Sequence, residues 1–248
     1  MLPRLFAGIS SGLPTSVKYK LKRFRRPYTF FMRLGQPEVQ IPSRAGLINW
    51  AIDELTSQQI LLGTYEPYMQ DAFAKFIRKG DVVYDVGAFA GYHSLLCGLL
   101  VGSTGRVFAF EPHPLNGVSI QRQLSLNPAV NVTLMRFALS DRNASVCFDT
   151  HAGRSQTHVS STGDLFAEAK SIDHLVESGV LAPPNLIKID VEGHEERVLL
   201  GGMKTIASNR PIVLCDHNDS STFETARDLL TPLGYEVANG SLVTGFPH

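Results

Sequence analysis

The stretch VVYDVGAFAGYHSL, residues 82–95, decides the fold. Its first part, residues 82–86, is a short apolar run, and a turn that contains Gly87 and Gly91 follows it. Short apolar runs that end at glycines are typical of buried strands, and the apolar segment at about 92–101 is long enough for a helix. We therefore predict a strand, a tight turn and a helix, in this order.

The same alternation of strands and helices continues downstream. We predict strands at 106–110, about 130–136, 186–190 and 212–216, and helices at 114–126, 195–207 and 222–230, the last ended by Pro232. Strands that alternate with helices at this spacing form parallel βαβ units. The predicted fold is α/β, with a doubly wound, mostly parallel sheet. A C-terminal hairpin at 235–237 and 241–244 closes it.

Two segments depart from this alternation. Apolar residues recur at helical spacing in 46–55 and in 68–77, and both patterns predict helices. The second has Thr64 as a cap, Pro67 in its first turn and Gly80 at its end.

Alternating residues at 144–150 and 157–161 predict a hairpin inserted into the sheet or over its edge. The predicted organisation is an arm at 1–45, N-terminal helices at 46–80 and a main domain at 81–248, with an insertion at about 143–180.

Length and composition exclude several classes of protein. The chain has 248 residues, of which 44% are apolar and 19% charged, which is typical of a globular protein and not of a disordered or fibrous one. No apolar run approaches the roughly 18 residues of a membrane-spanning helix. Cys97, Cys147 and Cys215 are far apart, which argues against a disulfide framework and a cysteine-based zinc site. We expect a cytoplasmic setting.

The charge is distributed unevenly along the chain. Residues 1–33 contain eight basic residues and no acidic one, which leaves 15 basic and 23 acidic residues after Arg33. One interpretation is an amphipathic helix that binds an anionic membrane surface or an acidic partner. A transit peptide has a similar composition. The interpretation that we favour is a solvated arm that packs on the acidic body of the same protein.

Acidic residues stand at the carboxyl ends of the predicted strands, where an open α/β sheet binds its ligand. They are Asp85, Glu111, Asp141, Asp190, Glu192 and Asp216. A nicotinamide dinucleotide would bring a pyrophosphate to this edge and is normally bound by G-x-G-x-x-G, a spacing that this turn lacks. A cationic ligand suits the acids better. S-adenosylmethionine carries an ammonium, a sulfonium and a ribose, and Glu111 is placed to accept hydrogen bonds from the ribose hydroxyls.

Five stretches in this order strongly resemble the FkbM-type S-adenosylmethionine-dependent methyltransferases. They are VVYDVGAFAGYHSL (82–95), VFAFEPHP (107–114), ALSD (138–141), SIDHL (171–175) and LIKIDVEGHEERVLLGG (186–202). GTYEP (63–67) resembles the segment that precedes the fold in that family. The resemblance covers about residues 63–214. It implies a class I methyltransferase with a Rossmann-like seven-stranded sheet that methylates hydroxyl groups of natural products, sugars or lipid-linked glycans.

The resemblance also implies roles for individual residues. Those implied to bind the cofactor include Asp85, Gly87 and Gly91 at the methionine portion, Glu111 at the ribose and Asp141 by the adenine. The others implied to bind it are Glu66, Ala88, Phe89, Pro112, His113, Ala138, Leu139 and Asp190. Asp190 and Glu192 would face the methyl group and the acceptor. Two positions depart from the family pattern: Phe89 stands where a polar residue is usual, and Asp216 where Glu is usual.

Methyl transfer from a sulfonium is an in-line displacement, so the enzyme positions the acceptor oxygen and excludes water. The hydroxyl proton must also be accepted, and we expect Asp190 or Glu192 to do this, with His194 as the next candidate. Glu195 opens a predicted helix, where a carboxylate is favoured for structural reasons. A divalent metal on Asp190, Asp216 and either His217 or Asn218 is the alternative activator, resembling the magnesium site of catechol-type O-methyltransferases, and we do not favour it.

Three alternatives to an O-methyltransferase stay open. One is a methyltransferase-like module that binds a partner or a membrane through residues 1–33 without catalysis. The second is a nicotinamide-dependent oxidoreductase. A nucleic-acid methyltransferase is less expected, because a base-gripping Asn/Asp-Pro-Pro-aromatic motif is absent where DVEG stands. The acceptor is therefore expected to be a small molecule or glycan, in a pocket formed partly by the inserted hairpin with Arg154 and His158.

Overall fold

A computed structural model describes residues 38–150, 158–160, 163–216, 220–239 and 243–247. The basic segment at 1–33, most of the predicted arm at 1–45, Arg154, His217 and Asn218 lie outside these residues. No helix in the described part of the chain combines the length and the apolar character that a bilayer crossing requires.

The central layer is a twisted sheet at whose edge the acids gather. Within the described residues it has seven strands in the order β12-β13-β11-β10-β3-β4-β5. Their bounds are β3 Val82–Val86, β4 Arg106–Phe110, β5 Val132–Met135, β10 Leu186–Ile189, β11 Ile212–Cys215, β12 Tyr235–Asn239 and β13 Val243–Pro247. Strand β13 runs antiparallel to both of its neighbours, β11 and β12, and the other pairs described in this sheet are parallel. The predicted doubly wound, mostly parallel sheet with a C-terminal hairpin is confirmed.

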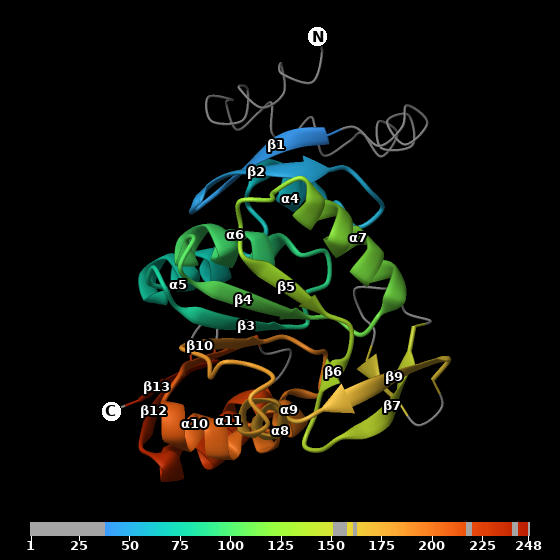
Figure 1. Cartoon of the computed structure of the whole chain (residues 1–248). Helices are drawn as coiled ribbons and strands as arrows, with labels where there is room; N and C mark the ends of the chain where they lie inside the picture. The colour runs from blue at the N-terminus through green and yellow to red at the C-terminus, as the bar shows by residue number, and fades with distance from the viewer. Residues whose placement is uncertain (1–37, 151–157, 161–162, 217–219, 240–242, 248) are drawn as a thin grey trace.

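Helices cover both faces of this sheet (Figure 1). On one side lie α4 Gln58–Leu62, α5 Pro67–Phe76, α6 Tyr92–Val101 and α7 Pro114–Ser125, and on the other α8 Ile172–Glu177, α9 Glu195–Leu200, α10 Met203–Asn209 and α11 Ser220–Leu230, followed by the 3-10 turn Thr231–Leu233. Successive strand residues point to opposite faces. Val83 therefore packs in the apolar cluster with α6, whereas Tyr84 and Val86 pack in the cluster with α9.

The prediction of a helix at 46–55 is wrong. Residues Gly46–Ala51 form strand β2, which pairs antiparallel with β1 Glu38–Ser43. Ile48 and Trp50 are buried, whereas the side chain of Asn49 points outward and bonds to the carbonyl of Leu126. Leu47, which supported the helical spacing, is 60% exposed. Ile48 and Ala51 are spaced as on a helix, whereas Ile48 and Trp50 follow the period of a strand, and antiparallel pairing with β1 selects the period of two.

The helix predicted at 68–77 is confirmed as α5, with Pro67 at its first position. Its N-cap is Glu66, not Thr64, and Glu66 has a φ of 41°. An L-residue in this region is strained, and such strain is found mostly at functional sites.

The single helix predicted at 195–207 is divided in two at Gly201 and Gly202. A Cβ on Gly201 would lie 1.9 Å from the carbonyl oxygen of Ser140. Only glycine permits so close an approach of the two backbone segments, and α9 ends and α10 begins at this contact.

The insertion forms a second sheet beside the main one (Figure 1). Its strands are β6 Ala138–Leu139, β7 Ala144–Asp149, β8 His158–Val159 and β9 Leu165–Lys170, in the order β6-β9-β7-β8. The antiparallel pair of β7 and β8 confirms the predicted hairpin. Strand β9 was not predicted, although LFAEAK alternates apolar and polar residues, and it carries most of the pairing with β7.

The contact between Gly201 and Ser140 gives a first prediction. Gly201→Ala should lower the free energy of unfolding by about 2–3 kcal/mol, because a backbone atom blocks the added methyl group. Gly202→Ala is the matched control: its Cβ would meet the end of the Ile172 side chain at 3.1 Å, so we expect a loss of about 1 kcal/mol or less. Urea unfolding measures both, and equal losses would contradict the explanation.

Candidate active site

Backbone hydrogen bonds between neighbouring strands bring the predicted acids to one edge of the sheet. The amide of Asp190 donates to the carbonyl of Val86 at 3.1 Å, and the amide of Asp216 donates to that of Ile189 at 2.9 Å. The amide of Glu111 donates to Met135 at 3.0 Å. The ladder thus extends one residue beyond β10, β11 and β4, and all three carboxylates begin at the same level of the sheet.

The turn after β3 lies directly against the end of β10. Gly87 has a φ of 81°, and a Cβ on it would lie 1.9 Å from the carbonyl oxygen of Asp190. The amides of Gly87 and Ala88 both donate to Phe110 at 3.1 Å. Phe89 follows with a φ of 48°. This turn is the predicted glycine turn, and its close approach to Asp190 requires the glycine.

Glu111 is held by the same turn. One carboxylate oxygen accepts from the amide of Phe89 and the other from the amide of His113, each at 2.8 Å. Glu111 is 6% exposed, and burial raises its pKa to about 7 although the two amides act in the opposite direction. The side chain of Asn116 also hydrogen-bonds to this carboxylate. The geometry suits the predicted role of a ribose acceptor.

A buried lysine, which sequence reasoning missed, lies among the acids. Lys188 is 1% exposed, and its Nζ lies 3.1 Å from Asp85 and 3.4 Å from Asp190. Nζ also donates to the carbonyl of Gly87 at 2.8 Å. Burial alone would lower the pKa of Lys188, but the carboxylates of Asp85 and Asp190 outweigh it, and the pKa is raised. The available signal was a lysine between isoleucines in a buried strand, since such a charge must be paired.

Asp85 is fully buried behind this lysine. Its carboxylate also accepts a hydrogen bond from the hydroxyl of Ser94. The lining of the neighbouring pocket includes Lys188 but not Asp85. A direct contact of Asp85 with the methionine portion stays a prediction; in this structure Asp85 positions Lys188.

A polar pocket lies in front of Lys188. It is lined by Tyr65, Gly87, Ala88, Phe89, Ala90, Tyr92, His93, Lys188 and Asp190. His93 is 5% exposed, and burial, together with Lys188, lowers its pKa to about 3. The imidazole is therefore neutral near pH 7. The predicted residues Gly87, Ala88 and Phe89 meet here, and Gly91 caps α6 beside them with a φ of 82°.

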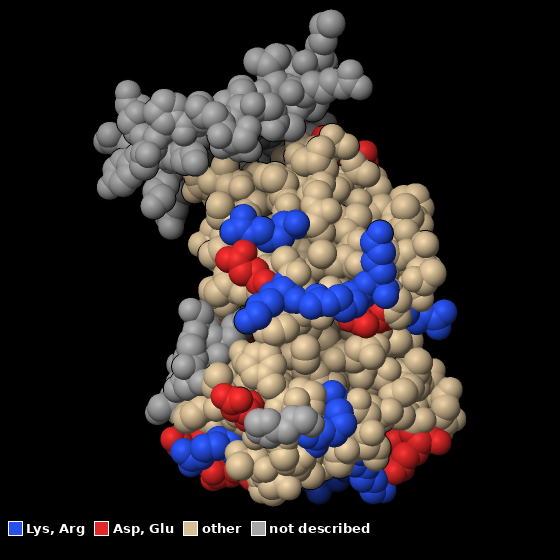
Figure 2. Space-filling model, turned by 90° about the vertical axis from the view of Figure 1, so that its left-hand side faces the viewer, with Lys and Arg blue, Asp and Glu red and all other residues tan. Residues whose placement is uncertain are grey.

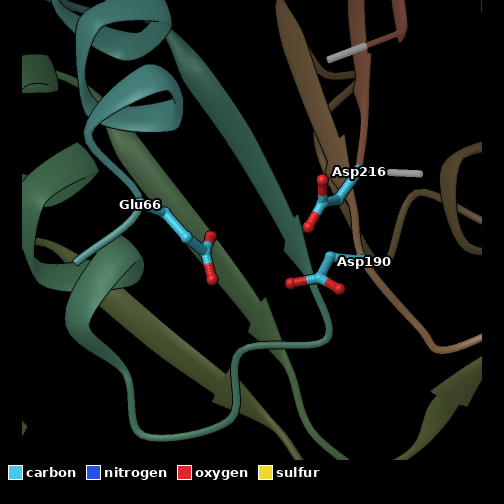
Figure 3. A group of neighbouring side chains, drawn as sticks. All are labelled: Glu66, Asp190 and Asp216. Carbon is cyan, nitrogen blue, oxygen red and sulfur yellow. The ribbon is translucent and has the colours of Figure 1, made fainter. Parts of the chain in front are cut away.

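Glu66, Asp190 and Asp216 point toward one another across the mouth of this region (Figure 3). One carboxylate oxygen from each residue lies within 4.8 Å of the other two. Burial raises the pKa of Glu66 to about 7, Lys188 opposes this, and Asp190 and Asp216 add to it. Sequence reasoning placed Glu66 with the cofactor and Asp216 at the rim, but it did not bring the two together.

An apolar pocket adjoins the polar one and shares Gly87 with it. It is lined by Val86, Gly87, Phe110, Pro112, Ala138, Leu139, Phe148, Val159, Val191 and His194. Pro112, Ala138 and Leu139 are among the residues predicted around the cofactor. Phe148 and Val159 come from β7 and β8, so the insertion forms part of this pocket. Its part in an acceptor pocket stays a prediction. Val159 is the neighbour of His158 in β8.

Asp141 is not among the residues that line the apolar pocket, and its carboxylate is hydrogen-bonded elsewhere. Its carboxylate accepts from Ser140 at 3.1 Å and from Arg197 at 3.0 Å. Burial opposes ionisation of Asp141, but Ser140 and Arg197 outweigh it and lower its pKa. Its predicted place beside adenine stays a prediction.

The other predicted residues around DVEG differ in their surroundings. His194 Nε2 lies 3.0 Å from the hydroxyl of Ser140, and burial lowers the pKa of His194. Glu195 accepts from the amides of Val191 and Gly193, which agrees with the structural role expected for it. Glu192 is half-buried and has a φ of 53°. His113 caps α7 by accepting from the amide of Leu115.

The sequence pattern of the Methyltransferase FkbM domain matches residues 85–237. The chain belongs to the FkbM methyltransferase family. It is 34% identical over 141 residues to the hexuronic acid methyltransferase AglP of Haloferax volcanii, a match that covers 56% of this chain and 57% of AglP. It is 24% identical over 169 residues to the 2-O-methyltransferase NoeI of Sinorhizobium fredii, covering 60% of this chain and 68% of NoeI. The match thus spans little more than half the length of AglP.

Solved structures agree on the fold. An FkbM methyltransferase from Methylobacillus flagellatus KT superposes with a TM-score of 0.50 at 17% identity, covering 79% of this chain and 55% of that one. A precorrin-6y C5,15-methyltransferase from Geobacter metallireducens GS-15 also gives 0.50, at 18% identity, covering 79% and 92%. The class I methyltransferase fold expected from the sequence is therefore confirmed.

The raised pKa of Glu111 predicts how stability depends on pH. Between its ordinary value of 4.5 and about 7, the folded protein holds a proton that the unfolded chain has released. The contribution of Glu111 to stability is therefore full below pH 4.5 and is lost as the pH rises to 7, by up to about 3 kcal/mol. Glu111→Gln should remove this dependence. The free energy of unfolding of the variant, measured without ligand, should therefore rise relative to that of the wild type from pH 5 to 8. Parallel urea-unfolding curves against pH would contradict the assignment.

Proposed function

We propose that this protein is an S-adenosylmethionine-dependent O-methyltransferase that acts on a sugar or glycan. The observation that carries the proposal is the pair of adjoining pockets joined at Gly87, one apolar and one polar, with Glu111 held in the turn beside both. An adenine suits the apolar pocket, a ribose suits Glu111, and the charged methionine end suits the polar pocket. Membership of the FkbM family supports the same cofactor.

Electrostatics support the choice of a cationic cofactor. Among the described residues near the polar pocket, the carboxylates of Glu66, Asp85, Asp190 and Asp216 outnumber the ammonium of Lys188, which pairs with Asp85 and Asp190. S-adenosylmethionine brings two positive groups and one carboxylate, so it reduces the excess of negative charge. A dinucleotide pyrophosphate would increase this excess, which argues against the oxidoreductase alternative.

The methyl transfer places few demands on the protein. The acceptor oxygen attacks the methyl carbon in line with the sulfonium, the new C–O bond forms, and the sulfur leaves as a neutral thioether with the bonding electrons. The hydroxyl proton passes to a carboxylate, for which we propose Asp190 or Glu192. His194 is a weaker candidate, because it lines the apolar pocket and its Nε2 is engaged with Ser140.

The names of the relatives guide the choice of acceptor. AglP is a hexuronic acid methyltransferase and NoeI a 2-O-methyltransferase. We propose a hexose or hexuronic acid unit as the acceptor.

A separate proposal concerns the basic segment at residues 1–33. We propose that the protein is cytoplasmic and that this segment binds an acidic partner or a membrane surface. Figure 2 shows one face on which Lys and Arg side chains lie beside Asp and Glu side chains.

Cofactor binding is tested by calorimetry with S-adenosylhomocysteine. We expect one site per chain, and Glu111→Gln should weaken binding roughly 10- to 100-fold, because hydrogen bonds to a charged group contribute about 1.5–3 kcal/mol. Glu236→Gln on the exposed side of β12 is the control and should bind like the wild type. An absence of wild-type binding would overturn the proposed function.

Methyl transfer is tested with radiolabelled S-adenosylmethionine and a panel of hexoses, hexuronic acids and their glycosides. We expect label in the sugar fraction that survives mild alkali, because an ether is stable to base and a methyl ester is hydrolysed. Transfer should fall at least 100-fold when the proton acceptor is removed by Asp190→Asn or Glu192→Gln, whichever serves. Alkali-labile label would instead assign the reaction to a carboxylate, and no label on any sugar would contradict the acceptor class.

A further inference from the structure

We propose that Glu66, Asp190 and Asp216 form a binding site for a hard divalent cation such as Mg²⁺ or Ca²⁺. The three carboxylates come from the N-cap of α5 and from the ends of β10 and β11, and they converge on one space (Figure 3). The site differs from the metal site expected at Asp190, Asp216 and either His217 or Asn218, because Glu66 supplies the third ligand and His217 and Asn218 lie outside the described residues.

The oxygens of the three carboxylates lie close enough together for one ion to draw them into its coordination sphere. Two ligand atoms of one ion cannot lie farther apart than twice the metal–oxygen distance. This upper limit is about 4.2 Å for Mg²⁺ and about 4.8 Å for Ca²⁺. The three carboxylate oxygens lie within 4.8 Å of one another. A small movement of these side chains would complete the geometry for the smaller ion.

A second observation points to a ligand at this place. Among the described residues, Glu66 Oε2 and His93 Nε2 are buried atoms with no hydrogen-bond partner, and they lie 3.7 Å apart. His93 is 5% exposed and lines the same polar pocket as Asp190. Buried polar atoms are almost always satisfied in native proteins, so two orphaned atoms facing one another mark a place where a group binds. A hydrated cation on Glu66 supplies both a positive charge and water molecules that can bond to His93.

The neighbours of the triad fix its carboxylates. Lys188 Nζ lies 3.4 Å from Asp190 Oδ2, and it is tied to Asp85 and to the carbonyl of Gly87. It therefore balances Asp85 and part of Asp190. The hydroxyl groups of Tyr65 and Tyr68 interact with Glu66 and Asp216, respectively. Such outer partners orient metal ligands and restrict their rotation.

A cation here would deepen the proposed function, on which this part of the inference rests. It would bind two neighbouring oxygens of the acceptor, either vicinal hydroxyls or a carboxylate and a hydroxyl, and lower the pKa of the hydroxyl to be methylated. The acceptor class narrows to sugars with such an oxygen pair.

The test uses Mn²⁺ as the probe and the full chain as the sample. The electron paramagnetic resonance signal of free Mn²⁺ reports binding, first without ligand and then with saturating S-adenosylhomocysteine. We expect one Mn²⁺ per chain in both cases, displaced by Mg²⁺ or Ca²⁺. Asp216→Asn and Glu66→Gln should each weaken binding at least tenfold, and Glu236→Gln should leave it unchanged. Thermal unfolding should show that Mn²⁺ raises the midpoint of the wild type and not of the two site variants.

Three outcomes would overturn the inference: no stoichiometric Mn²⁺ binding, binding that both variants retain, or displacement of Mn²⁺ by S-adenosylhomocysteine. The last would assign the acids to the amino group of the cofactor. Calorimetry on the same sample keeps the two proposals apart. If S-adenosylhomocysteine binds and Mn²⁺ does not, the cation site fails and the proposed function stands. If S-adenosylhomocysteine does not bind, the proposed function fails whatever Mn²⁺ does.

Discussion

The ammonium of Lys188, buried between Asp85 and Asp190, is the interaction on which the site depends. Taking three charges out of water is costly, and the cost is recovered only if they pair closely and their remaining bonding positions are satisfied. Here the carbonyl of Gly87 accepts from Lys188, and Ser94 donates to Asp85. The network joins β3, the turn after it, the end of β10 and α6. Removal of the lysine would leave two carboxylates without their cation, one of them fully buried, and would therefore strongly destabilise the fold.

The backbone around this network is held in conformations that L-residues rarely adopt. Among the described residues, four that are not glycine have a positive φ, and Glu66, Phe89 and Glu192 are three of them. All three belong to turns at the carboxyl edge of the sheet. Strain of this kind costs of order 1–3 kcal/mol for each residue and persists only where the surroundings over-determine it. Its concentration beside Lys188 indicates that the turns are held for binding, since the strands of the sheet would pair without it.

The sequence predicted the main sheet well, because each strand is a short apolar run followed by a turn, and parallel order follows from the alternation. It failed where two periods coincide. Residues 46–51 fit a helix and a strand equally, and only pairing with β1 decides between them. It also missed the division of the helix at Gly201, where the backbone approaches the carbonyl of Ser140, because a contact with a residue 61 positions earlier has no local signal. The acids of the site were found because strand ends are readable, but Lys188 was missed because a lysine inside a strand is normally exposed.

The same reasoning explains why the grouping of Glu66 with Asp190 and Asp216 was not predictable. Asp190 and Asp216 follow adjacent strands, so their proximity is a consequence of sheet order. Glu66 precedes the sheet by 16 residues and reaches it only because α5 packs against α6, which itself packs on β3 and β4. The direction of its side chain then depends on the left-handed conformation of Glu66 at the N-cap of α5, whereas sequence rules predict the cap at Thr64. These three carboxylates outnumber the nearby ammonium of Lys188, and Glu66 Oε2 and His93 Nε2 have no hydrogen-bond partner in the described part of the chain, so a positive ligand would stabilise the group. The fold nevertheless brings these carboxylates together, by packing α5 on α6 and α6 on the sheet. We therefore interpret the unfavourable free energy of this grouping as a consequence of its role in binding.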